Sequence, residues 1–93
     1  MTVEEIRNKI LPILQTNGAA RVGLFGSAAR GAANPDSDID ILVDIPKRMT
    51  LLDLIGIKQQ LEKVLGKKVD LVEYQALKPA LREKILQQQT VLL

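Results

Sequence analysis

The sequence predicts a small α/β (α+β) domain in which helices flank a mixed β-sheet of about three strands. Apolar residues recur at helical spacing in some segments, and short segments rich in strand-forming residues separate them. The two kinds of segment take turns along the chain, which gives the expected order α-β-α-β-α-β-α. Because the chain has 93 residues, 46% of them apolar, we expect a single domain over residues 1–93 with one small core.

The first predicted helix covers residues 2–16. Thr2 and Glu5 have the spacing of a capping box at its start. Pro12 lies inside this segment and is expected to kink the helix or to shift its end. The apolar face of the helix is formed by Val3, Ile6, Ile10, Ile13 and Leu14.

Two predicted strands follow this helix. Residues 20–25 form the first and stop at Gly26, and residues 27–30 fit one helical turn. Residues 31–37 have the composition of a turn, and residues 38–44 then alternate as a second strand. One face of that strand carries Ile39, Ile41 and Val43, and the other carries Asp38, Asp40 and Leu42.

The C-terminal half predicts a helix, a strand and a final helix. Thr50 and Asp53 mark the start of the first of these helices, and Gly66 marks its end. Residues 68–74 form the third strand, and Pro79 suits the first turn of the last helix. The expected apolar faces are Leu51, Leu54, Ile55, Leu61, Val64 and Leu65 for the first helix and Leu81, Ile85 and Leu86 for the last; in the strand, Lys68, Asp70 and Val72 share one face.

Composition removes several kinds of chemistry. The chain has no cysteine and no histidine, so disulfides, thiol nucleophiles, zinc fingers and imidazole bases are excluded. Thirteen basic and eleven acidic residues give a net charge of +2, too small for electrostatic coating of nucleic acid or membrane as the main activity. No apolar run reaches the roughly 18 residues of a membrane helix. We therefore expect no membrane association, and a reducing cytoplasm is the natural location.

The carboxylates of Asp38, Asp40 and Asp70 are the candidate catalytic and metal-binding groups. Asp38 and Asp40 are two residues apart on a predicted strand, so they point to one side with Cα atoms ~7 Å apart. If the second and third strands are neighbours, Asp70 lies roughly 5 Å to the side of this pair. Three carboxylates in this arrangement suit magnesium, which prefers oxygen ligands.

The turn after the first strand is the candidate nucleotide-binding loop. Gly26 ends the strand and Ser27 opens a helical turn, so backbone N–H groups and a hydroxyl can approach an anion. Arg30 lies one turn later and could reach the same anion, or it could pair with a nearby aspartate on the surface. Phosphate donors that face acidic metal ligands indicate a nucleoside triphosphate site, with two metal ions assisting in-line attack on phosphorus.

Two other motifs, a P-loop and an EF-hand loop, are excluded because the sequence lacks residues that they require. A phosphate-binding P-loop needs Lys and Ser/Thr after its second glycine, whereas alanines follow Gly31. An EF-hand loop that starts at Asp36 would need glycine in place of Ile41 and glutamate in place of Lys47. The acidic residues and the glycine-led turn also have a simpler interpretation, as a solvated strand edge and an ordinary turn.

The joint pattern resembles the signature of the DNA polymerase β-type nucleotidyltransferase superfamily, in its minimal nucleotidyltransferase (MNT) branch. The similarity covers nearly the whole chain and depends on Gly26-Ser27-x-Ala29-Arg30-Gly31, on Ser37-Asp38-x-Asp40 and on the Lys68-Val69-Asp70-Leu71-Val72 strand. It implies that Gly26 and Ser27 hold the triphosphate of ATP and that Asp38 and Asp40 bind two Mg²⁺ ions. Asp70 would complete the site as a metal ligand and as the base for the attacking hydroxyl.

The same resemblance implies a reaction and a partner. Many MNT proteins are antitoxins that transfer AMP from ATP onto a tyrosine of a helical HEPN-domain ribonuclease toxin, with release of pyrophosphate. Two alternatives stay open: an antitoxin that acts by binding alone, and a nucleotidyltransferase with a small-molecule or nucleic-acid acceptor. The absence of a strong basic stripe argues against nucleic acid. A second protein that presents the acceptor is the expected partner, because so small a domain leaves little surface for binding one.

Overall fold

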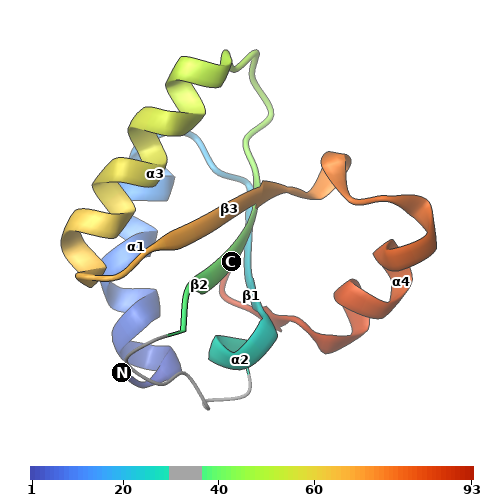
Figure 1. Cartoon of the computed structure of the whole chain (residues 1–93). Helices are drawn as coiled ribbons and strands as arrows, with labels where there is room; N and C mark the ends of the chain where they lie inside the picture. Colours follow the sequence, from blue (N-terminus) through green and yellow to red (C-terminus); the bar gives the residue numbers. More distant parts are fainter. Residues whose placement is uncertain (30–36) are drawn as a thin grey trace.

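The structure, a computed structural model, describes residues 1–29 and 37–93. The predicted class and element order are confirmed, with one further strand at the C-terminus (Figure 1). The predicted turn at residues 31–37 falls almost entirely outside the described residues. Along the chain the elements are α1 (Val3–Thr16), β1 (Arg21–Phe25), α2 (Gly26–Ala29), β2 (Ile39–Asp44), α3 (Leu51–Leu65), β3 (Val69–Glu73), the 3₁₀ helix η1 (Tyr74–Ala76), α4 (Pro79–Gln88) and β4 (Thr90–Val91).

The strands form one mixed sheet in the order β3-β2-β1-β4. β2 runs parallel to β3, and β1 runs antiparallel to both β2 and β4. The sequence predicted three of these strands and missed β4. β4 has only two residues, too few for an alternating pattern, and it forms because Thr90 and Val91 pair with Leu24 and Gly23 of β1.

Helices α1 and α3 cover one face of the sheet and enclose the core (Figure 1). The alternation of β2 is confirmed, because Ile39, Ile41 and Val43 are all buried in this core. Leu42 on the opposite face is also fully buried. The helices contribute Ile6, Ile10, Leu11 and Leu14 from α1 and Ile57, Leu61 and Leu65 from α3.

Both predicted capping boxes are present. The Glu5 N–H donates to the Thr2 hydroxyl at 3.1 Å, and the Asp53 N–H donates to the Thr50 hydroxyl at 3.1 Å. Each capping carboxylate in turn accepts from the backbone N–H of its threonine. Helix α1 continues past Pro12 to its C-terminus, so the proline does not shift the end of the helix.

The predicted apolar face of α3 is partly wrong. Its buried stripe is centred on Ile57, Leu61 and Leu65, which are spaced by four residues, and the sequence prediction did not include Ile57. At about 100° per residue, Leu51 and Ile55 fall on one margin of this stripe and are exposed. Val64 falls on the other margin and is exposed as well.

The other face of the sheet is partly open, and α4 projects beside it as an arm (Figure 1). None of the α4 residues is fully buried: of the predicted apolar face, Ile85 and Leu86 are half-buried and Leu81 is exposed. Both ends of the arm are nevertheless held, because the Tyr74 hydroxyl donates to Gln89 Oε1 at 2.6 Å. No helix in the described part of the chain is long and apolar enough to cross a membrane.

Candidate active site

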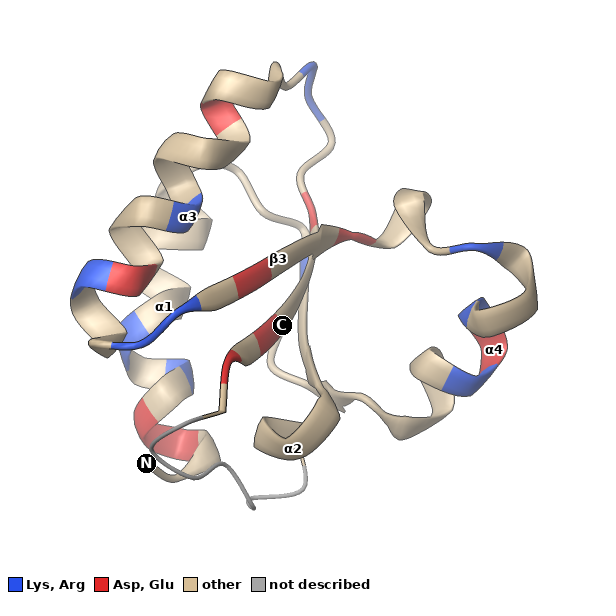
Figure 2. Ribbon diagram, in the orientation of Figure 1, with Lys and Arg blue, Asp and Glu red and all other residues tan. Residues whose placement is uncertain are grey.

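Asp40 and Asp70 lie next to each other on the open face of the sheet. They are direct partners in the parallel register of β2 and β3, so their Cα atoms are about 5 Å apart. Figure 2 shows the acidic positions of β2 and β3 on neighbouring strands, with α2 at the same end of the sheet as the start of β2. The second and third strands are therefore neighbours, which is the condition on which the placement of Asp70 depended, and their register brings these two candidate residues together.

Gly26 lies against the carboxylate of Asp40. It follows Phe25, which is the register partner of Asp40 across the antiparallel β1–β2 pair. The backbone of Gly26 has φ +68°, and a Cβ atom placed there would overlap Asp40 Oδ2. Only glycine combines this left-handed conformation with such close approach to an acid. The turn after β1 and the acid of β2 thus form one compact unit.

Helix α2 begins at this unit. Ser27 is its second residue and is half-buried. The far end of α2 is tied to the C-terminal strand, because the Thr90 hydroxyl donates to the carbonyl of Ala29 at 2.9 Å. Arg30, the remaining candidate for nucleotide binding, lies outside the described residues.

The charge of Asp38 also reaches this site. Asp38 is exposed and directly precedes β2, on the same side as Asp40. Burial raises the pKa of the Asp40 carboxyl, and the neighbouring charges of Asp70 and then Asp38 raise it further. The three carboxylates are therefore electrostatically coupled, and a cation placed among them would relieve their repulsion.

The carboxylates of Asp38, Asp40 and Asp70 are the kind of ligand that Mg²⁺ binds, but the three side chains do not converge on one point. Carboxylate oxygens are the ligands that Mg²⁺ prefers, and all three candidates supply them. Within residues 1–29 and 37–93, however, no three acidic side chains lie close enough together to hold an ion. The arrangement that the structure does show is the pair Asp40 and Asp70, with Asp38 exposed at the margin.

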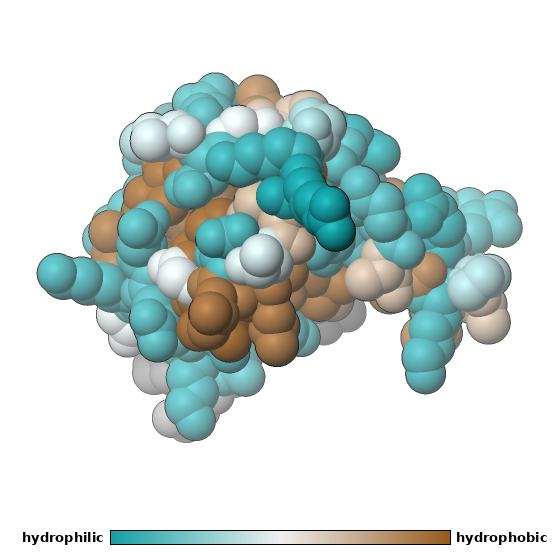
Figure 3. Space-filling view, turned by 90° about the horizontal axis from the view of Figure 1, so that it is seen from above, coloured by the Kyte–Doolittle hydropathy of each residue, from teal (hydrophilic) through white to brown (hydrophobic). Residues whose placement is uncertain are grey.

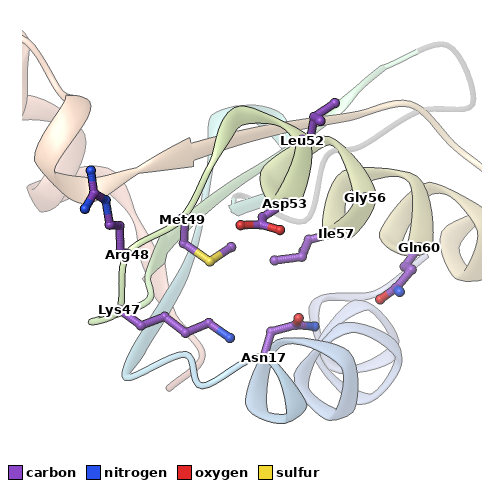
Figure 4. A pocket seen from close by; sticks show the side chains of 9 residues that line it. All are labelled: Asn17, Lys47, Arg48, Met49, Leu52, Asp53, Gly56, Ile57 and Gln60. Carbon is purple, nitrogen blue, oxygen red and sulfur yellow. The ribbon is translucent and has the colours of Figure 1, made fainter.

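A hollow on the surface lies away from the acidic pair. It has a volume of about 350 Å³ and is formed by the end of α1, the segment after β2 and the first half of α3 (Figure 4). Asp40 lies near the start of β2, whereas this hollow follows its end. We place the candidate active site at the acidic pair because the carboxylates of Asp40 and Asp70 and the turn at Gly26 lie there. The hollow is lined by Asn17, Lys47, Arg48, Met49, Leu52, Asp53, Gly56, Ile57 and Gln60.

Comparison with known proteins identifies the family of the chain. The model of the nucleotidyltransferase domain family matches residues 7–93. The chain belongs to this family and is a nucleotidyltransferase. A candidate protein adenylyltransferase of Methanocaldococcus jannaschii is 46% identical over 86 residues, which cover 92% of each chain. The protein adenylyltransferase MntA of Thermococcus cleftensis is 37% identical over 92 residues, which cover 95% of this chain and 93% of the relative.

Solved structures share the same fold. A candidate minimal nucleotidyltransferase superposes with a TM-score of 0.84 at 42% identity, over 97% of this chain and 95% of the other. The structure of the tri-AMPylated Shewanella oneidensis HEPN toxin in complex with an MNT antitoxin matches with a TM-score of 0.78 at 26% identity, over 99% of this chain and 72% of the matched chain. The resemblance to the MNT branch is confirmed by these matches.

Sequence reasoning missed two residues, one that supports the site and one that lies against the ends of the α4 arm. Thr90 anchors α2, and its role depends on β4, which has no sequence signal of its own. Gly23 in the middle of β1 is the second, because a Cβ there would meet the Tyr74 hydroxyl and Gln89 Oε1. An isolated glycine inside a predicted strand is the one signal that could have indicated this close approach.

Proposed function

We propose that this nucleotidyltransferase transfers AMP from ATP to a hydroxyl group of a partner protein, with Mg²⁺ as cofactor. The observation that carries the proposal is the unit formed by Gly26, Asp40 and Asp70, in which a glycine-led turn meets two coupled carboxylates. The adenylyltransferase names of the relatives and the AMPylated toxin in a matched complex support AMP as the transferred group.

The turn at α2 would hold the triphosphate. The hydroxyl of Ser27 and the backbone N–H groups at the start of the turn are donors that phosphate oxygens accept. Gly26 leaves room for that approach and keeps the turn close to Asp40. Arg30 would add a charged donor from the following segment.

Asp38, Asp40 and Asp70 would hold the metal, with two ions in the arrangement that the family resemblance implies. Bound there, Mg²⁺ would neutralise the coupled carboxylates, lower the pKa of the attacking hydroxyl and stabilise charge on the leaving oxygens. The hydroxyl oxygen of the acceptor attacks the α-phosphorus of ATP and forms a new P–O bond. The bond between the α-phosphorus and the bridging oxygen breaks, and pyrophosphate leaves. Asp70, on the edge strand and exposed, would take the hydroxyl proton.

We further propose that the acceptor is a tyrosine of a helical HEPN-type toxin and that the chain acts as its antitoxin in the cytoplasm. The matched complex of a HEPN toxin with an MNT antitoxin supports this choice. The open face beside Asp40 and Asp70 leaves the site accessible to a side chain that a second protein presents.

The decisive experiment combines the purified chain, α-labelled ATP, Mg²⁺ and a purified helical HEPN-type protein as the acceptor. We expect label on the HEPN-type protein and the added mass of AMP by intact mass spectrometry, both lost in excess chelator or with Asp40→Asn. Asp44→Asn is the matched control, because Asp44 lies on the same strand and face but outside the site. A stable complex without transfer would favour the binding-only antitoxin, and label on nucleic acid or on a small molecule would favour the other alternative.

A further inference from the structure

A hydrogen-bonded pair, Tyr74 and Gln89, lies against Gly23 on the sheet. The Tyr74 hydroxyl donates to Gln89 Oε1 at 2.6 Å, and a Cβ atom at Gly23 would overlap both of these oxygens. Gly23 lies two residues before Phe25 on β1, and Phe25 is the register partner of Asp40. Positions two apart on a strand, and direct register partners, share one face of a sheet. Tyr74 and Gln89 are therefore on the face that carries the acidic pair.

This pair also lies close to the candidate active site. Two residues along β1 and one strand across separate Gly23 from Asp40, which places their Cα atoms roughly 8 Å apart. Thr90, directly after Gln89, donates to the carbonyl of Ala29 at 2.9 Å and so ties this segment to α2. The end of α4 returns to the sheet beside α2 (Figure 1), whereas the rest of the arm stands out from the body of the molecule (Figure 3).

The side-chain amide of Gln89 has a fixed orientation. The Tyr74 ring is buried, and the Arg21 guanidinium lies 4.2 Å from its centre. Burial raises the pKa of the Tyr74 phenol, so the hydroxyl stays a donor at neutral pH and takes the amide oxygen as its acceptor. Gln89 is half-buried, and within the described residues its Nε2 group makes no hydrogen bond. Oε1 keeps a second lone pair, so one donor and one acceptor remain available side by side.

Adenine presents the complementary pair of groups. Its N6 amino group donates and the ring nitrogen next to it accepts, which is why Gln pairs with adenine through two hydrogen bonds. Hypoxanthine and guanine have a carbonyl oxygen in place of the N6 amino group, and that oxygen would face Gln89 Oε1. A free amide could turn over to match them, but the bond from Tyr74 holds this one in place.

The direction from the acidic pair to Gln89 is also the one left for the base. The proposed function assigns the triphosphate to the turn at Gly26 and the acceptor hydroxyl to Asp70 on the edge strand. The remaining path from Asp40 runs along β1 toward Gln89, and the ribose would span it. Phe25 lies along this path on the same face and is half-buried, so it offers an aromatic surface on which a base can stack.

We propose that Gln89, held by Tyr74, is the residue that selects adenine in the bound nucleotide. Oε1 accepts from the N6 amino group, and Nε2 donates to the ring nitrogen beside it. The inference deepens the proposed function and rests on it for the identity of the substrate, ATP. Gln89 would contact the base and not the reacting phosphorus, so it determines which nucleotide binds and takes no part in forming the new P–O bond.

Two variants, Gln89→Ala and Tyr74→Phe, test the selection. Affinities for ATP and for inosine triphosphate, whose base is hypoxanthine, are measured by calorimetry with Mg²⁺ and without an acceptor protein. Gln88→Ala is the matched control, because Gln88 is the neighbouring glutamine and is exposed. Arg82→Ala is a second control, because it removes the 3.0 Å bond from Arg82 to the Tyr74 carbonyl and leaves the Gln89 amide intact. Circular dichroism and thermal melting verify that all four variants fold.

We expect the wild type to bind ATP at least about tenfold more tightly than inosine triphosphate. Gln89→Ala should reduce this preference to within about twofold by weakening ATP binding. Tyr74→Phe should reduce it by strengthening the binding of inosine triphosphate, because the freed amide can turn over. Both controls should keep the wild-type preference. A wild type without preference, a preference that survives either Gln89→Ala or Tyr74→Phe, or an equal loss in the controls would overturn the proposal.

The same measurements separate this inference from the proposed function, because they require no transfer. If the wild type prefers ATP through Gln89 but no AMP reaches the acceptor protein, the base selection stands and the proposed reaction fails. If AMP is transferred while Gln89→Ala keeps the preference for ATP, the reaction stands and the assignment of Gln89 is wrong.

Discussion

The backbone of Gly26 lies directly against the carboxylate of Asp40, so the turn proposed to bind phosphate and the acid of β2 are packed together. Gly26 has φ +68° and leaves no room for a side chain. The glycine therefore has two separable roles: it adopts a left-handed backbone conformation, and it lets the acid approach. Gly66 at the end of α3 has φ +66° with nothing within 4 Å of an added Cβ, so it isolates the first role.

We predict that Gly26→Ala lowers AMP transfer at least about tenfold, whereas Gly66→Ala leaves it unchanged. Both variants place a Cβ at a left-handed residue, which costs roughly 1–2 kcal/mol of stability. Only at Gly26 does the new methyl group also displace the carboxylate of Asp40. Thermal melting gives the stability change, and labelled ATP gives the transfer rate. Equal activity of the two variants would show that the close approach has no functional role.

The second prediction concerns the charge coupling of Asp40 and Asp70. The pKa of Asp40 is raised in the folded protein, so the native state holds that proton more tightly than the unfolded state does. The contribution of Asp40 to the free energy of unfolding therefore falls as pH rises from the ordinary carboxyl pKa of 3.8 through the raised pKa. The ionised Asp40 still destabilises the folded protein at neutral pH. Asp70→Asn removes one of the charges that raise the pKa of Asp40. We expect a lower Asp40 pKa and a higher melting temperature at neutral pH.

At a pH below the ordinary carboxyl pKa, Asp70→Asn should change the melting temperature little through this interaction, because Asp40 is then protonated in both the folded and the unfolded state. Carbon-detected NMR titration of the Asp40 carboxyl and melting curves at several pH values test both parts. Glu73→Gln is the control, since Glu73 lies on the same strand but on the opposite face. A stabilisation of equal size in the control would assign the effect to net charge and not to the pair.

Local pattern was sufficient for most of the fold. The alternation around Ile39 and Ile41 predicted both the strand and its buried face, and the capping boxes at Thr2 and Thr50 predicted two helix starts. These features depend on neighbours a few residues away, so a single sequence contains them. The same holds for the pairing of Asp38 with Asp40 on one side of β2.

Features that depend on distant contacts could not be predicted. Asp70 lies beside Asp40 only because β2 and β3 pair in this parallel register, and two periodic segments do not specify their relative register. β4 exists only as a partner of β1. The exposure of Leu51 also has no local signal, since an apolar residue on the margin of a helix face can be buried by a neighbour or left open.

The third prediction concerns Thr90, which β4 brings to the end of α2. Thr90→Val removes the hydroxyl that donates to the Ala29 carbonyl and keeps the side-chain shape, so stability should fall by about 1 kcal/mol. Because α2 carries Ser27, we also expect weaker ATP binding. Thr16→Val removes a similar hydroxyl-to-carbonyl bond, of 2.7 Å to Pro12 on α1, the helix that covers the opposite face of the sheet. Titration with ATP should show weaker binding by Thr90→Val than by Thr16→Val. Equal ATP affinity of the two variants would show that Thr90 does not support the site.

The last prediction concerns the attachment of the α4 arm. The bond from the Tyr74 hydroxyl to Gln89 joins the two ends of the arm above Gly23, and the Arg21 guanidinium lies 4.2 Å from the centre of the Tyr74 ring. Burial raises the pKa of the Tyr74 phenol, so this group stays protonated and able to donate at neutral pH. Tyr74→Phe and Gln89→Ala should each cost about 1 kcal/mol, and the double variant should cost less than their sum.

Because α4 buries none of its own residues, the loss of this bond should loosen the arm more than the core. Hydrogen exchange should therefore rise across residues 79–88 and stay slow in β2, whose Ile41 and Val43 are fully buried. Gln88→Ala is the control on the same helix, since Gln88 is exposed. Gly23→Ala should reproduce the loosening by a different route, because its methyl group would displace both partners of the bond. Exchange that rises equally in β2 would mean that the arm and the core unfold as one unit.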